Sequence, residues 1–141
     1  MNNTRKLSRF APAFMAGVTM LSWAMVADAD DTIEIGQDVW IEAGCASCHG
    51  SRGQGGTDPD SPAGPSLRTT QLSEDEMFEV IACGRRGVSG MPGWARGAYF
   101  EMACYGETPG QVPEDVLLIE AFDADQIDAL VAYIFTTFVQ D

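Results

Sequence analysis

Apolar residues recur at helical spacing in three separate stretches of the chain, and each stretch predicts a helix. The first covers residues 33–43, where apolar or small positions three or four residues apart lead straight into a pair of cysteines. The last begins after Asp123, which forms a capping pair with Gln126, while Phe122 and Ile127 stand at the positions of a hydrophobic staple. An apolar stripe then runs to the C-terminus through Ile127, Leu130, Val131, Ile134 and Phe138.

The middle stretch begins with a capping box, Ser73 followed three residues later by Glu76, and it ends at a glycine. The apolar residues that this helix would bury are Met77, Phe78, Val80 and Ile81. Residues 53–64 and 105–118 are rich in turn-forming residues and predict loops, with one helical turn expected at 114–118. No strand pattern occurs, so the sequence predicts an all-α fold with long loops.

The N-terminus has the three parts of a secretory signal peptide. Three basic residues come first, namely Arg5, Lys6 and Arg9. An apolar run covers residues 10–26, and small residues at Ala27 and Ala29 supply a cleavage site. We therefore expect residues 1–29 to be removed and residues 30–141 to form a single domain in the periplasm, with no membrane span left. The alternative is an uncleaved anchor, although the run is slightly short for a span.

The strongly acidic charge narrows the choice of partners. The whole chain has a net charge of −13, and residues 1–29 hold three of its eight basic residues and one of its 21 acidic residues. Residues 30–141 therefore carry −15, contain no lysine, and have all their arginines between positions 52 and 96. Nucleic acid and anionic membranes are poor partners for such a surface. A partner protein with a basic docking patch fits it, and the alternative is that the charge only maintains solubility.

The stretch Cys45, Cys48 and His49 reads as C-x-x-C-H, in which two thiols can attach a haem covalently and the histidine can ligate its iron. His49 is the one histidine of the chain. Two other interpretations remain: a zinc site completed by Cys83 or Cys104, and a thiol redox pair. In an oxidising compartment we expect Cys83 and Cys104 to form a disulfide, with two free buried thiols as the alternative.

Four landmarks in order give a resemblance to a known family. They are the C-x-x-C-H at 45–49 after a short helix, Gly-Pro-Ser-Leu at 64–67, Gly-Met-Pro at 90–92 and Leu-Val-Ala-Tyr-Ile at 130–134. Together they resemble the class I c-type cytochromes over nearly all of residues 30–141. The resemblance implies a small cytochrome c fold in which the first and last helices cross over one covalently bound haem c. Its helix contact would join Gly36, Trp40 and Tyr133.

The same resemblance implies the residues of the site. His49 and Met91 would be the axial ligands, with Cys45 and Cys48 holding the haem through thioethers. Met77 and Met102 are the other methionine candidates, but Met77 fits the core of its helix and Met102 stands beside Cys104. The residues that would support the haem are Pro65, whose carbonyl would accept a hydrogen bond from His49, and Leu67 and Trp94, which would pack near the porphyrin. Arginines at 52, 68, 85, 86 and 96 are all candidates for the haem propionates.

These features predict an exported, monomeric one-electron carrier and no enzyme, because the one histidine is already assigned to iron. Its donor would be a protein such as a periplasmic dehydrogenase, and its acceptor one such as a terminal oxidase. The cysteines that bracket Met91 suggest a specialised branch serving such dehydrogenases. Two alternatives stay open: a haem-based ligand-binding or sensing protein with an open sixth position, and a zinc or dithiol redox protein.

Overall fold

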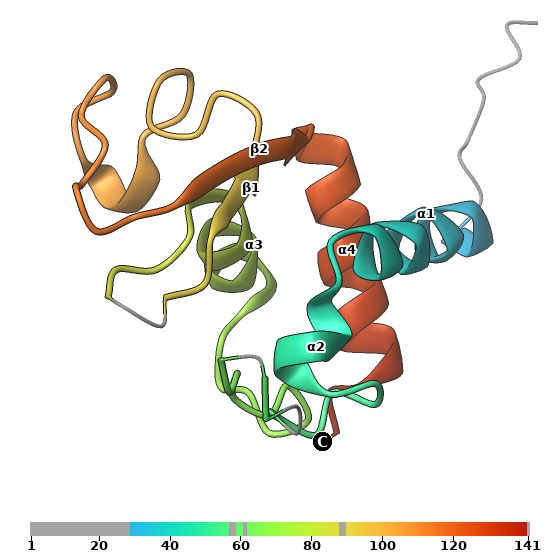
Figure 1. The fold of residues 1–141 in the computed structure, drawn as a ribbon. Helices are drawn as coiled ribbons and strands as arrows, with labels where there is room; N and C mark the ends of the chain where they lie inside the picture. The colour runs from blue at the N-terminus through green and yellow to red at the C-terminus, as the bar shows by residue number, and fades with distance from the viewer. Residues whose placement is uncertain (1–28, 57–58, 61, 88–89, 141) are drawn as a thin grey trace, which may run out of the picture.

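The computed structural model describes residues 29–56, 59–60, 62–87 and 90–140, and within them the fold is mostly helical, as predicted (Figure 1). Its elements in chain order are α1 (Ala29–Glu42), α2 (Cys45–His49), α3 (Glu74–Cys83), β1 (Gly93–Ala95), the 3-10 helix η1 (Cys104–Gly106), β2 (Leu118–Phe122) and α4 (Ala124–Thr137). No helix in these residues is long and apolar enough to cross a bilayer. The expected signal peptide lies outside the described residues, except for Ala29.

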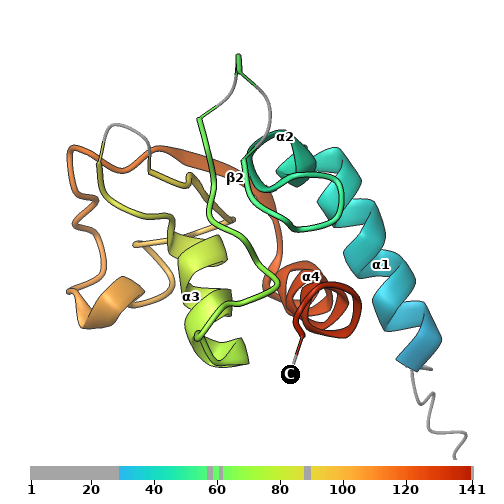
Figure 2. The same cartoon turned by 90° about the horizontal axis from the view of Figure 1, so that it is seen from below.

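Helices α1 and α4 cross and form the main helical contact (Figures 1 and 2). A Cβ atom on Gly36 would lie 2.6 Å from the carbonyl carbon of Ala129 and 2.7 Å from the Cβ of Tyr133, so only glycine fits at this crossing. The ring of Trp40 packs against Tyr133 and Phe138, with centroids 6.3 and 4.9 Å apart. The expected contact between Gly36, Trp40 and Tyr133 is therefore present.

Side-chain caps fix the start of α3 and of α4. The Ser73 hydroxyl accepts a hydrogen bond from the Glu76 N–H at 3.3 Å, and the Glu76 carboxylate accepts one from the Ser73 N–H at 2.8 Å. Asp123 and Gln126 make the same reciprocal pair at the start of α4. Both predicted capping boxes are confirmed, and the apolar stripe of α4 is buried from Ile127 to Phe138.

Two short parallel strands correct the expectation that the chain has none. Gly93 of β1 pairs with Leu118 of β2, and Ala95 pairs with Phe122, with an irregularity between them. The helical turn expected at 114–118 is also wrong: only residues 114–115 form a turn, and strand β2 begins at Leu118. The strands could not be predicted from the sequence because β1 has only three residues and pairs with a segment far along the chain. Neither strand shows a sustained alternation of apolar and polar residues.

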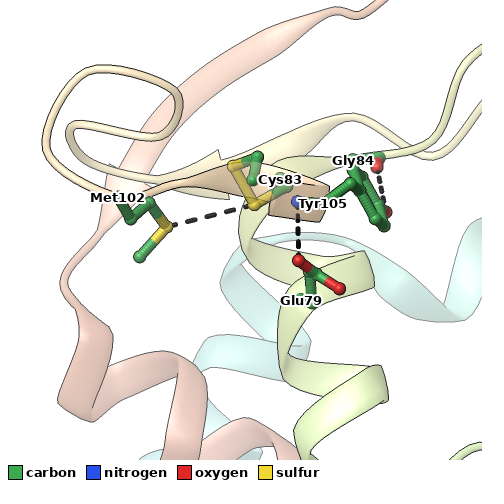
Figure 3. The surroundings of a disulfide bond; sticks show 6 residues. Glu79, Cys83, Gly84, Met102 and Tyr105 are labelled. Carbon is green, nitrogen blue, oxygen red and sulfur yellow. Dashed lines mark hydrogen bonds between the residues drawn. A yellow bond between two sulfur atoms is a disulfide. The ribbon is translucent and has the colours of Figure 1, made fainter. Parts of the chain in front are cut away.

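A disulfide joins the end of α3 to η1, as expected from the cysteine count (Figure 3). The Cα atoms of Cys83 and Cys104 lie 5.7 Å apart, and both residues are buried. Beside the bridge, the Tyr105 hydroxyl donates to the Gly84 carbonyl at 2.6 Å, and the Tyr105 N–H donates to the Glu79 carboxylate at 2.6 Å. These contacts tie the segment after β1 to the point where the Met91 loop leaves α3.

Candidate functional site

Helix α2 presents the C-x-x-C-H motif to a cavity. Gly44 adopts the left-handed conformation, with φ of 65°, and so turns the chain sharply between α1 and α2. Residues three and four apart in a helix lie on one face, which groups Cys45 with Cys48 and His49. All three line one cavity of about 1000 Å³. That volume is at the upper end of ligand pockets, about 300–1,000 Å³, so a large ligand is expected.

The remaining site residues predicted from sequence line the same cavity. Pro65 and Leu67 come from the loop after α2, Met91 from the segment after α3, and Trp94 from β1. Trp94 also packs on Phe122 of β2 at a centroid distance of 5.8 Å. The fold thus brings all seven predicted site residues to one cavity. The seven are Cys45, Cys48, His49, Pro65, Leu67, Met91 and Trp94.

His49 is buried and its ring is held in one orientation. Ring Nδ1 lies 3.0 Å from the Pro65 carbonyl oxygen. Because a carbonyl oxygen can only accept, Nδ1 carries the proton and Nε2 keeps a free lone pair for a metal. This is the hydrogen bond that the sequence analysis expected, and it is the usual way in which a ligating imidazole is oriented.

Gly64 lets the loop after α2 lie flat against this ring. Its N–H donates to the Cys48 carbonyl at 2.9 Å. A Cβ atom at position 64 would lie 2.9 Å from Nδ1 of His49, closer than side chains pack. Any larger residue would therefore push the loop away and break the hydrogen bond between His49 and Pro65.

Cys45 does not have the lowered pKa of a reactive redox thiol. Both motif cysteines are free thiols in the structure, and burial raises the pKa of the Cys45 thiol to about 12. Reactive redox cysteines have a lowered pKa, because the thiolate is the nucleophile. Cys45 therefore lacks the activated thiolate that a redox pair needs.

Zinc is not supported by the ligand geometry. The further ligands of such a site would be Cys83 or Cys104, and these are bonded to each other. Among the described residues, no group of three or more histidine, cysteine or acidic side chains is placed to hold a metal ion. A haem needs only one protein ligand on each side of the ring, so the pattern suits haem better.

The structure separates the three methionine candidates. Met91 and Met77 both line the cavity. The Met102 sulfur does not reach it and lies 4.0 Å from the sulfur of Cys83 (Figure 3). Met77 is buried on α3, whereas Met91 stands in a loop that Arg85 holds through a 2.7 Å hydrogen bond from its N–H to the Met91 carbonyl. The core role expected for Met77 therefore extends to the cavity wall.

Part of the cavity wall was not predicted from the sequence. Thr69, Thr70 and Leu72 line the cavity from the loop before α3, and Leu117 reaches it from the residue before β2. Leu72 and Leu117 are also exposed, so they form an apolar edge of the cavity that faces solvent. Loop residues carry no periodic signal, and only the fold reveals their place.

The C-x-x-C-H motif, with its oriented histidine, shares an apolar cavity with a methionine loop. A helical domain with such a site has the features of a protein that attaches haem. The sequence model of the family Cytochrome c matches residues 33–138, so the chain belongs to the cytochrome c family. A search of curated proteins finds no match to the chain. Membership implies a covalently bound haem c and a haem-based electron-carrier role.

Proposed function

We propose that this protein is an exported, single-haem electron carrier whose haem is attached through Cys45 and Cys48 and ligated by His49 and Met91. The observation that carries the proposal is the convergence of all these side chains on one cavity, with Nε2 of His49 free to ligate. Bound haem would supply a one-electron Fe(III)/Fe(II) couple. The protein acts as a carrier and not as an enzyme.

Each residue has a separate task in this proposal. Cys45 and Cys48 fix the haem edge at α2, so the cofactor cannot dissociate. Pro65 orients the His49 ring, and Leu67 and Trp94 line the cavity, where they would pack near the porphyrin. Met91 supplies a thioether ligand, which raises the potential relative to stronger donors.

We propose the periplasm as the compartment, because family members are usually exported and Cys83 and Cys104 are disulfide-bonded. The donor would be a protein such as a periplasmic dehydrogenase, and the acceptor one such as a terminal oxidase. The charge of −15 on residues 30–141 favours basic docking patches on these partners. A monomer is sufficient for this function, since the cavity is built from one chain.

Haem loading tests the site. The chain is expressed with a haem-maturation system, and intact mass and haem absorption are measured for the wild type and for Cys45→Ser, Cys48→Ser and His49→Ala. We expect one haem per wild-type chain, one thioether or no haem in each cysteine variant, and no stable holoprotein in His49→Ala. Ser51→Ala is the matched control, because Ser51 follows the motif closely, is exposed and does not line the cavity, so this variant should load normally. Normal loading of His49→Ala would contradict the assignment.

A further inference from the structure

The charged residues that line the cavity are of one sign. Arg85 and Arg86 line it, and no aspartate or glutamate among the described residues does. This is unexpected in a chain with 21 acidic and eight basic residues. A cavity that gathers two cations and no carboxylate, in a protein of net charge −13, is suited to an anionic part of its ligand.

The chemistry of haem supplies that anionic part. Its two vinyl groups lie on one edge of the ring and its two propionates lie on the opposite edge. Cys45 and Cys48 would hold the vinyl edge at α2, so the propionates would point to a wall away from α2. The segment that follows α3 and carries Arg85 and Arg86 lies apart from α2 in both views (Figures 1 and 2). We infer that Arg85, with Arg86 beside it, binds a haem propionate; this inference rests on the proposed function.

Arg85 and Arg86 differ in the hydrogen bonds and ion pairs that their side chains already make. Nη2 of Arg86 donates to the Glu107 carboxylate at 2.7 Å, so part of its charge is compensated. The guanidinium of Arg85 makes no hydrogen bond or ion pair with the described part of the chain. Arg85 therefore has all its donors available for a carboxylate, which it can grip through two parallel hydrogen bonds.

The other three arginines are placed elsewhere. Nε of Arg68 donates to the Arg52 carbonyl at 2.8 Å, and Nη2 of Arg96 donates to the Ala121 carbonyl at 2.6 Å. None of the three lines the cavity. Arg52 is exposed on the loop after α2, so its removal changes the net charge by the same amount without touching the cavity.

Arg85 also connects the propionate site to the ligand loop. Its backbone N–H donates to the Met91 carbonyl at 2.7 Å, and Arg85 is one of the residues that line the cavity. A propionate bound to the guanidinium would therefore hold residue 85, and through it the loop that presents the methionine. Arg85 would thus both compensate the charge of the propionate and hold the loop that positions Met91.

The test compares holoproteins carrying Arg85→Gln, Arg85→Lys and Arg52→Gln with the wild type. The midpoint potential is measured together with the propionate bending mode in the resonance Raman spectrum, which moves when a carboxylate loses a hydrogen-bond donor. Loss of the cation leaves a propionate uncompensated and favours Fe(III). We expect Arg85→Gln to shift the redox equilibrium constant at least threefold toward the oxidised form, about 30 mV at 59 mV per tenfold. Its propionate mode should also shift.

Arg52→Gln should move the potential less and leave the propionate mode unchanged. If Arg85→Gln fails to mature, Arg85→Lys carries the test, because lysine keeps the charge but not the paired donors and should still shift the mode. A loaded wild type in which the Arg85 variants and Arg52→Gln behave alike would overturn the propionate site alone. A wild type without haem would overturn the proposed function, and the propionate site with it.

Discussion

At the scale of single residues, the proton on the His49 ring decides whether the cavity can bind iron. The Pro65 carbonyl oxygen accepts a hydrogen bond from Nδ1–H, with the two atoms 3.0 Å apart, so Nε2 is the atom left to ligate. Gly64 allows this contact because no side chain separates the loop from the ring. The iron ligation that we propose for His49 would thus depend on one backbone carbonyl and one glycine as much as on the histidine itself.

Met91 should be the methionine on which the haem potential depends. Both Met91 and Met77 line the cavity, so Met91→Leu and Met77→Leu form a matched pair. Met91→Leu should abolish the methionine–iron absorption band and lower the potential by a sizeable part of the range of about 0.8 V that axial ligands span. Met77→Leu should keep the band and cost less than about 1.5 kcal/mol of folding free energy, as volume-conserving swaps do. The reverse outcome would make Met77 the ligand.

At the scale of helices and strands, local chemistry determines how much can be predicted. Helices α3 and α4 could be predicted because their capping boxes act within four residues, and α1 because it carries an apolar stripe. The five-residue α2 and the pairing of β1 with β2 could not, since they depend on contacts made only in the fold. The ligating motif was predictable from its spacing, whereas Leu117 and Thr70 reach the cavity from loops with no pattern.

Gly36→Ala should destabilise the crossing of α1 and α4. Helix propensity alone would make alanine more stable by about 1 kcal/mol. The added Cβ would meet the Ala129 carbonyl and the Tyr133 side chain, and overpacking of this kind costs about 1–3 kcal/mol, so a net loss is expected. Denaturant unfolding of the holoprotein measures it. Gln37→Ala, on the exposed face of the same helix, is the control. If Gly36→Ala were more stable than the wild type, the two helices would not be in close contact.

The capping box of α3 should contribute to stability in a pH-dependent way. Hydrogen bonds from the Ser73 N–H, and then from its hydroxyl, lower the pKa of Glu76 below its ordinary value of 4.5. A pKa that is lower in the folded state gives stability that is fully present above the unfolded value and is lost as the pH falls through the folded value. The unfolding midpoint of Glu76→Gln should therefore lie below that of the wild type at neutral pH, and the gap should close below about pH 4.5. A gap that persists in acid would contradict this.

The disulfide should stabilise both the fold and the ligand loop. Cys83 and Cys104 are 21 positions apart, and a bridge over such a loop contributes about 3 kcal/mol in the chain-entropy model. Cys83→Ala/Cys104→Ala should lower the free energy of unfolding by this order and weaken the methionine–iron band at a lower temperature than in the wild type. Tyr105→Phe removes only the hydrogen bond to Gly84 and should give a smaller effect in the same direction. If the methionine–iron band of the double variant weakened at the same temperature as in the wild type, the disulfide would not stabilise the ligand loop.

At the scale of the whole molecule, a strongly negative net charge surrounds an apolar cavity whose charged lining residues are two arginines. Residues 30–141 carry −15, and acidic side chains crowd locally at the starts of α3 and α4. Burial raises the pKa of Asp128, and the charges of Asp125 and Asp75 add to the rise. Such crowding is unfavourable for folding, and a basic partner protein would compensate it on docking.

Electron exchange with a basic redox protein should therefore slow as salt increases. The Debye length falls from about 30 Å at 0.01 M to about 8 Å at 0.15 M, so attraction at a distance is largely removed over that range. We expect the second-order rate to fall on the order of tenfold. An acidic redox protein of similar potential is the control, and its rate should rise with salt. Equal rates with the basic partner at both salt concentrations would remove electrostatic steering from the account.

The measurement that tests the electron-carrier assignment most directly is the pair of absorption spectra of the mature holoprotein, oxidised and reduced. His49 and Met91 as the two axial ligands predict a low-spin spectrum, with a sharp α band when reduced and a weak methionine–iron band when oxidised. A high-spin spectrum with rapid binding of external ligands would contradict the account. It would mean that Met91 leaves the sixth position open and that the protein binds or senses ligands.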